Sequence, residues 1–447
     1  MSEKQNIQHL LSRAGFGPRL KESTELENNS LSNVLNTIFR NSDQTEYLNV
    51  VQPDIISPLK FQSLTESKKQ EQIKKSRELI VKLNSAWVHK MINDKLVLRE
   101  KLTFFWHDHF ACRTLNPWFA QQLNNVMRNL ALDKFGNLLL AVTKSPAMLQ
   151  FLNNQQNRKS SPNENFAREL LELFTIGQGN YTEYDIKSAA RAFTGWGFNQ
   201  QGKYIFRTNF HDYSRKDFMG KSGSFNGENI LKIILDRRET ATFLTRKIYK
   251  YFVNEDVNET HLISLSESFY NSGYDIKKLM FDIFSSKWFY SYENHKCLIK
   301  SPVELLVGLQ GVFPIHFRNN KSQVFLQKAL GQVLFNPPNV GGWPYGTEWI
   351  DSTSLAFRIQ LPFALGSSLN SNHKKFGNLE MVINWEDFIK KTSPYDYNSM
   401  AVWMLGMIPD SKESEVLFSV IKKGATEQPN KALMILALAS LPEYQLC

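Results

Sequence analysis

The chain has 447 residues, of which 42% are hydrophobic and 21% charged, and its 53 Lys and Arg against 43 Asp and Glu give a formal net charge of +10. This composition excludes a mainly disordered or fibrous chain. The three cysteines form no Cys-x-x-Cys pair, so we expect no disulfide framework. The basic residues are scattered and mixed with Glu, so the net charge does not predict a nucleic-acid partner.

The amino-terminal segment is polar and mixed in charge, without the apolar stretch of a signal peptide. No uncharged apolar run approaches the roughly 18–20 residues that a membrane span requires. From the sequence we therefore expect a cytoplasmic protein with no transmembrane segment.

Helical periodicity dominates the chain, because apolar residues recur at spacings of three and four. The predicted helices span residues 70–95, 95–110, 119–132, 134–153, 161–177, 182–196, 227–252, 261–272, 275–284, 301–312, 324–335, 385–391, 400–407, 411–423 and 430–441. Residues 203–210 give the best strand signal, and it is short. The pattern predicts an all-α fold: one large multi-helix domain over residues 1–447, with irregular loops and at most a minor β-hairpin. A smaller C-terminal helical part over residues 385–447 fits the same pattern.

Three helix starts carry strong capping signals. Ser161, followed by Pro162 and by Glu164 three residues on, predicts an N-cap with a capping box. Thr182 opens the next helix in the same way. Ser301 opens the helix over residues 301–312, and capping alone explains the acidic residue Glu304 that follows it. Residues 161–196 therefore form a predicted helix–loop–helix pair.

The first helix of this pair has a charged stripe, in which Glu164, Arg168 and Glu172 follow one another at intervals of four. An amphipathic helix whose charged face meets water explains the stripe. Alternatively the polar face lines a cleft, with Glu169 nearest the apolar border. A desolvated carboxylate has a raised pKa and serves as a general acid or base, so Glu169 is the first catalytic candidate and Glu164 the second. Arg168 is the candidate for holding an anion.

Histidines provide the candidate metal ligands. His107 and His109 point about 160° apart on a regular helix, so they share a metal only if the helix ends near Trp106. The structural alternative is that one of these two histidines lies in the core and the other is exposed. His211, which precedes Asp212 in a loop, is a candidate third ligand to a divalent metal ion, and Asp212 a candidate base. A simple turn with a side-chain hydrogen bond also explains that dipeptide.

A loop rich in proline and glycine, residues 336–349, carries candidate binding residues and is called the aromatic loop here. Trp343, Tyr345 and Trp349 suit a stacking platform for a sugar or a base, or else fix the loop to the helical body. Trp196, at the end of the predicted helix pair, is a further candidate. No sequence signature of a nucleotide site occurs, so we expect no nucleotide cofactor.

Ordered motifs cover nearly the whole chain: HLLSRAGFG (9–17), LREKLTFFWHDHF (98–110), the helix pair 163–196, residues 210–223 and 300–308, GQVLFNPPNVGGWPYGTEWI (331–350) and residues 438–445. In these motifs the chain resembles the domain-of-unknown-function 1800 family. Relatives often sit beside a domain-of-unknown-function 1501 protein, which is similar to phosphatases and sulfatases and often has a twin-arginine export signal. The resemblance thus implies such a partner, and export of this chain in complex with it.

The leading hypothesis is a metal-assisted hydrolytic or oxidative enzyme that acts on a polymer or a modified protein. In it the three histidines bind the ion, Glu169 or Glu164 transfers a proton, and Arg168 holds an anion. One alternative is a non-catalytic helical scaffold that binds the phosphatase-like partner through the aromatic loop. Another is a glycan-binding or glycan-cleaving protein, which requires two carboxyl groups about 5–9.5 Å apart in a cleft.

Overall fold

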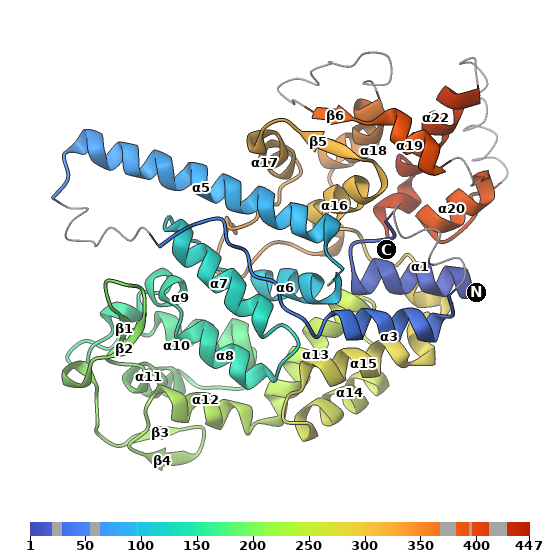
Figure 1. Cartoon of the computed structure of the whole chain (residues 1–447). Helices are drawn as coiled ribbons and strands as arrows, with labels where there is room; N and C mark the ends of the chain where they lie inside the picture. Colours follow the sequence, from blue (N-terminus) through green and yellow to red (C-terminus); the bar gives the residue numbers. More distant parts are fainter. Residues whose placement is uncertain (20–28, 54–62, 96, 367–380, 393–395, 411–426) are drawn as a thin grey trace.

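The computed structural model describes residues 1–19, 29–53, 63–95, 97–366, 381–392, 396–410 and 427–447 (Figure 1). Within these ranges the chain is mostly helical, which confirms the predicted all-α class. The predicted helix over residues 411–423 lies outside the described part. None of the described helices combines the length and the apolar character that crossing a membrane requires.

The longer helices follow one another along the whole chain. They are α1 (Glu3–Ala14), α3 (Leu31–Asn41), α5 (Glu66–Asn93), α6 (Val97–His109), α7 (Pro117–Asn129), α8 (Phe135–Thr143), α9 (Pro146–Phe151), α10 (Asn165–Glu169), α11 (Glu183–Ala192), α12 (Gly227–Leu235), α13 (Arg238–Phe252), α14 (Glu259–Asn271), α15 (Ile276–Ser285), α16 (Pro302–Val312), α17 (Asn320–Ala329), α18 (Ser352–Gly366), α19 (Trp385–Thr392), α20 (Tyr397–Leu405) and α22 (Glu427–Ala439). A π-helix, η3 (Leu170–Thr175), continues α10 directly.

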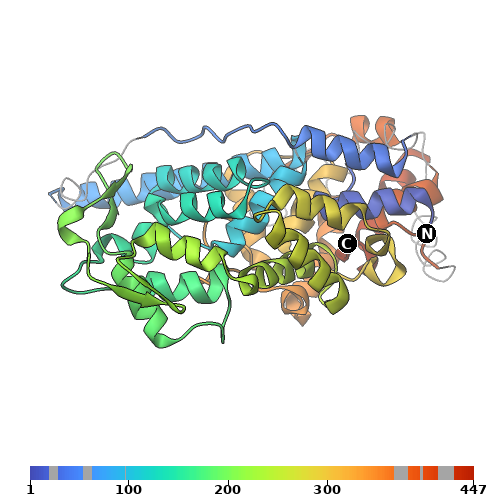
Figure 2. The same cartoon turned by 90° about the horizontal axis from the view of Figure 1, so that it is seen from below.

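Strands are short and form two-stranded antiparallel sheets in the described part of the chain. The pairs are β1 (Trp196–Phe198) with β2 (Tyr204–Phe206), β3 (Lys216–Phe218) with β4 (Lys221–Gly223), and β5 (Ile315–Phe317) with β6 (Met381–Ile383). The first two pairs lie at one end of an elongated body, and α18, α19, α20 and α22 lie at the other, near both chain termini, in both views (Figures 1 and 2).

Some predicted helices are divided in the structure. The segment 134–153 forms α8 and α9, because Ser145 caps a new helix by accepting a hydrogen bond from the Met148 N–H and Pro146 takes its first position. The segment 227–252 likewise divides into α12 and α13. Apolar periodicity runs through both breaks, so periodicity alone does not show them.

The predicted start of the helix at Ser161 is wrong. Ser161 instead pairs with Arg158 in a short antiparallel bridge. The helix begins at Asn165, whose N–H donates to the side chain of Asn163 at 3.0 Å. The capping boxes predicted at Thr182 and Ser301 are both confirmed.

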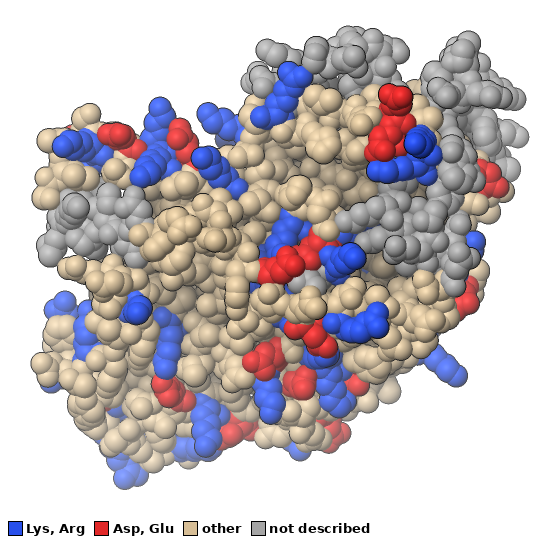
Figure 3. Space-filling view, viewed as in Figure 1, with Lys and Arg blue, Asp and Glu red and all other residues tan. Residues whose placement is uncertain are grey.

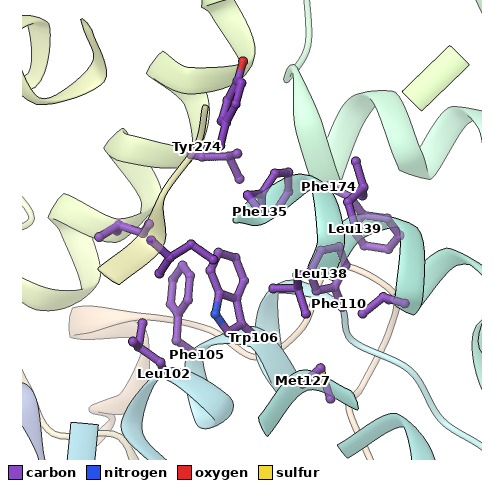
Figure 4. Close-up of a cluster of buried hydrophobic side chains, with 14 of the residues drawn as sticks. Leu102, Phe105, Trp106, Phe110, Met127, Phe135, Leu138, Leu139, Phe174 and Tyr274 are labelled. Atoms are coloured by element: carbon purple, nitrogen blue, oxygen red, sulfur yellow. The ribbon is translucent and has the colours of Figure 1, made fainter. Parts of the chain in front are cut away.

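The largest apolar core is built around α6, whose side chains from Leu98 to His109 are all buried. Trp106 of α6 and Phe110, the residue after this helix, pack with Phe135 and Leu138 of α8 and with Phe174 of η3 (Figure 4). A helix buried on every side must pair its polar groups internally. Because of this, every polar residue of α6 is a candidate for a defined role.

A second apolar cluster runs from Leu305 of α16 to Tyr444 and contains residues of α18, α19, α20 and α22. It includes described residues of the predicted C-terminal part over residues 385–447 but begins much earlier in the chain. Helix α16 joins this second cluster to α5 and α6, because its Val303 and Val307 pack with residues of those two helices in a third apolar cluster.

Candidate functional site

A pocket of about 420 Å³ lies where α6, α13, α16 and the aromatic loop meet. Its wall is mainly apolar and aromatic, with charged groups set into it. The charged and polar lining residues that matter below are Arg13, Lys101, Asp108, Lys247, Lys250, Tyr251 and Glu304. An enclosed apolar pocket with a few converging polar groups is the usual form of a ligand site.

Asp108, in the last turn of α6, is the buried carboxyl group of this pocket. Its Oδ1 accepts a hydrogen bond from the backbone N–H of Trp343 at 2.8 Å. Burial raises the pKa of Asp108 to about 7, and both the Trp343 N–H and the positive charge of Lys247 partly oppose that rise. A carboxyl group that titrates near neutral pH can both accept and donate a proton at that pH.

Lys247, on α13, is held beside Asp108 by the C-terminal end of η3. Its Nζ donates to the backbone oxygen of Leu173 at 3.2 Å. Carbonyl groups in the last turn of a helix lack partners within the helix and carry partial negative charge, so they suit an ammonium group. Burial lowers the pKa of Lys247, while the negative charge of Asp108 opposes that change.

Glu304, on α16, is the second carboxyl group in the wall. It completes the capping box with Ser301, as predicted, and it also forms a buried ion pair with Lys101. The Tyr251 hydroxyl donates to its Oε1 at 3.4 Å. Although burial opposes the change, Lys101 holds the pKa of Glu304 below its usual value. Capping alone thus does not account for this residue.

The aromatic loop supplies three of the predicted binding residues to the pocket. Trp343 and Trp349 are 4% and 6% exposed, and Tyr345 is 48% exposed. The two tryptophans therefore fix the loop to the helical body, and the ring of Tyr345 lies at the pocket with an open side. The structural interpretation of this loop therefore applies to the two tryptophans, and binding through Tyr345 stays a prediction.

The histidines that flank Asp108 are bound to backbone groups. His107 Nε2 accepts the N–H of Phe335 at 3.1 Å, and burial lowers its pKa to about 3. His109 Nε2 lies 3.0 Å from the backbone oxygen of Phe174 and donates to it, with its pKa also lowered by burial. Both rings are therefore neutral at ordinary pH and hold neighbouring segments against α6.

The predicted three-histidine metal site does not form in the described structure. Helix α6 continues through His109, so His107 and His109 keep opposite directions, as a regular helix requires. His211 lies in the loop after β2, where its Nδ1 is 2.9 Å from the backbone oxygen of Thr194. Among the residues described, no three of His, Cys, Asp and Glu are grouped so that they could hold a metal ion.

The charged stripe of the helix pair lies outside the pocket lining. Arg168 forms a two-pronged ion pair with Glu183 at 2.8 Å and lies 3.5 Å from Glu164. Glu169 is half-buried, and burial together with the charge of Glu172 raises its pKa. Arg168 is thus occupied by a carboxylate, while Glu169 keeps the partly desolvated character that the sequence suggested.

Two further candidate residues, Asp212 and Trp196, also lie outside the pocket lining. Asp212 accepts a hydrogen bond from Arg191 Nε at 2.7 Å. Although partial burial opposes it, hydrogen bonds from Ser214 and Arg191 lower the pKa of Asp212 to about 2, so it is ionised at neutral pH. Trp196 is buried in the core against Phe193. These residues stabilise their loops and do not line the pocket.

Sequence reasoning missed Asp108, Lys247 and Tyr251 as site residues. A signal was present, since Lys101 and Asp108 are seven residues apart and share one face of a helix, as do Lys247 and Tyr251 at a spacing of four. What the sequence does not show is that these two faces meet.

The fold and the pocket define an all-α protein with a pocket lined by aromatic and charged side chains. The model of the family described as "Protein of unknown function (DUF1800)" matches residues 9–446, so the chain belongs to that family. No curated protein and no solved structure gives a significant match. Several family-like segments, residues 98–110, 300–308 and 331–350, supply lining residues of the pocket.

Proposed function

We propose that the pocket is the active site of an enzyme that performs acid–base chemistry, and that Asp108 exchanges a proton with the bound ligand or with a water beside it. The observation that carries this proposal is a buried carboxyl group with a pKa of about 7 in the wall of a partly open pocket. Strongly shifted groups in clefts are typical of catalytic sites. Hydrolysis fits this arrangement, because a carboxylate that takes a proton from water can return it to a leaving group.

The remaining residues have supporting roles in this proposal. Lys247 stabilises negative charge that develops next to Asp108. Lys101 and Tyr251 hold Glu304 in one position, and the hydrogen bond from Trp343 holds Asp108 against the aromatic loop. Rigid support of this kind keeps reacting groups in a productive geometry.

The test is a substrate screen with three forms of the protein. Wild type, Asp108→Asn and Glu169→Gln are incubated with a panel of chromogenic esters, phosphate esters, sulfate esters and glycosides. We expect Asp108→Asn to lose about 100-fold or more of any turnover, and Glu169→Gln to keep it. Turnover that survives in Asp108→Asn and disappears in Glu169→Gln would move the active site to the helix pair.

Glycan cleavage is a second candidate, favoured by one observation. The pKa of Asp108 is raised and that of Glu304 is lowered, so one carboxyl group suits the acid and the other the charged partner. Glycoside hydrolysis uses such a pair beside aromatic residues that bind sugars. Turnover of a glycoside by wild type, abolished separately by Asp108→Asn and Glu304→Gln, supports it.

The metal-assisted reaction and the scaffold role remain separate predictions. Elemental analysis of the purified protein tests for a bound divalent metal. The scaffold role requires the aromatic loop to reach a partner, and in this chain only Tyr345 of its three predicted anchors is half exposed. Co-purification with a domain-of-unknown-function 1501 protein tests that partnership and the associated export.

A further inference from the structure

Arg13 of α1 is a buried arginine in the wall of the pocket, with 1% of its surface exposed. Its Nη2 donates to the backbone oxygen of Asn294 at 2.8 Å and to Sγ of Cys297 at 3.2 Å. Its Nε and Nη1 are buried and have no acceptor in the described structure. Buried guanidinium N–H groups are normally paired, because leaving them unpaired costs free energy.

Two buried lysines add positive charge behind this part of the wall. Burial, followed by the charge of Lys300, lowers the pKa of Lys296 to about 7, and Arg13 contributes to the same shift. Burial also lowers the pKa of Lys300 to about 8. The charges of Lys300 and Arg13 thus make a further cation beside Lys296 unfavourable, whereas Lys300 already lies near the negative charge of Glu304 and its shift comes from burial.

The carboxyl groups of the wall compensate for only part of this charge. The wall holds five cationic side chains (Arg13, Lys101, Arg246, Lys247 and Lys250) and three carboxyl groups (Asp108, Glu255 and Glu304). Glu304 is already paired with Lys101, and Arg246 is paired with Glu259 at 2.7 Å. Lys250, which is exposed at the pocket, has no ion pair within the described residues. On the outer surface, by contrast, basic and acidic side chains are interspersed over the face seen in Figure 3.

We infer that the pocket binds an organic anion, whose acid group is held by the free N–H groups of Arg13 and by Lys250 while its ring or apolar body rests against Tyr345 and Trp343. Guanidinium groups recognise carboxylate, phosphate and sulfate through paired, charge-assisted hydrogen bonds. The inference deepens the proposed function by naming the ligand class, and it holds equally for a pocket that only binds.

The experiment measures binding of matched small probes by titration calorimetry. Benzoate, phenyl phosphate and phenyl sulfate share a ring and differ in the acid group, and benzyl alcohol is the neutral comparison. We expect at least one anion to bind about tenfold or more tightly than benzyl alcohol, since a charge-assisted hydrogen bond contributes that much. The tightest anion identifies the acid group. Equal or weaker binding of all three anions would overturn the inference.

Variants locate the bound anion. Arg13→Gln and Lys250→Gln should each weaken the tightest anion by about tenfold, whereas Arg238→Gln, an exposed arginine on the same helix as Lys250, should leave it unchanged. If Arg13→Gln does not fold, Lys250→Gln and the probe series decide alone. Unchanged affinity in Lys250→Gln and in folded Arg13→Gln contradicts the inference. Asp108→Asn should retain the anion, so loss of turnover and loss of anion binding are distinguishable.

Discussion

The backbone N–H of Trp343 donates to Oδ1 of Asp108 at 2.8 Å, and this bond joins the last turn of α6 to the aromatic loop. The approach depends on Gly342, whose φ is +89° and whose Cα faces Asp108 so closely that an added Cβ would overlap the carboxylate. The glycine thus sets both the conformation of the loop and the position of the proposed catalytic group.

Gly342→Ala should therefore destabilise the protein more than strain alone explains. A positive φ costs an alanine about 1 kcal/mol, and overlap with Asp108 adds to this cost. Gly331→Ala is the matched control, because Gly331 has a φ of +94° and open space around its Cβ position. Chemical unfolding of both variants measures the difference. Equal losses of stability would show that the contact with Asp108 has no energetic consequence.

The stability of the protein should depend on the ionisation of Asp108. Its pKa is about 7 in the folded protein, and an aspartate in an unfolded chain titrates near about 3.9. Between these values the folded state keeps a proton that the unfolded state has released. The contribution of Asp108 to the free energy of unfolding is therefore full below about pH 4 and falls as the pH rises toward 7.

Asp108→Asn removes this dependence, because an amide does not ionise. Relative to wild type, the variant should gain stability between about pH 4 and 7, by at most about 1.4 kcal/mol for each pH unit. Urea unfolding across that range measures it. Asp212→Asn is the control of opposite sign, measured down to about pH 2: the pKa of Asp212 is lowered to about 2, so its stabilisation is present above about pH 4 and is lost as the pH falls from about 4 to 2. A constant difference between Asp108→Asn and wild type would contradict the prediction.

The buried ion pair between Lys101 and Glu304 should show strong coupling. Lys101→Met leaves Glu304 as an unpaired buried charge, and removing one partner of a buried pair costs about 3–5 kcal/mol. The double variant Lys101→Met/Glu304→Gln should recover part of that loss. Lys391→Met, which breaks an exposed pair with Asp387, should cost less than about 1 kcal/mol. A double-mutant cycle with no coupling energy would count against the proposed role of Glu304.

His107 should stabilise the fold through its bond to the Phe335 N–H. His107→Phe leaves that buried donor unpaired, which costs about 1–3 kcal/mol, and His107→Gln should recover some of it by offering an oxygen acceptor. His316→Phe, at an exposed position of β5, is the control and should change stability little. If His107→Phe is as stable as wild type, the hydrogen bond to the Phe335 N–H does not stabilise the fold and the prediction is wrong.

Much of the fold follows from local sequence signals. Helical periodicity and the capping residues Thr182 and Ser301 predict where helices lie and where some begin. Periodicity fails where one apolar stripe crosses two helices, as at Ser145. It also fails at the start of α10, where the side chain of Asn163, and not that of Ser161, accepts a hydrogen bond from the first helical N–H. In both cases a side-chain hydrogen bond decides the boundary and the apolar pattern does not change.

The site was only partly predictable. The aromatic residues were identified because proline and glycine mark an irregular loop around them. Asp108 and Lys247 come from distant parts of the chain, and their proximity depends on how α6, α13 and η3 pack. Glu304 has a sufficient local explanation in its capping box, so its bond to Lys101 was hidden. Contacts between distant helices are what a single sequence does not provide.

The account depends most on the titration of Asp108. Carbon-13 NMR of the aspartate side-chain carboxyl groups, recorded from pH 3 to 9 on wild type and Asp108→Asn, measures it directly. We predict one resonance with a midpoint near pH 7 that is missing from the variant. If every aspartate of the wild type titrates below about pH 5, as in exposed sites, Asp108 is not a proton-exchanging group and the proposed active site is contradicted.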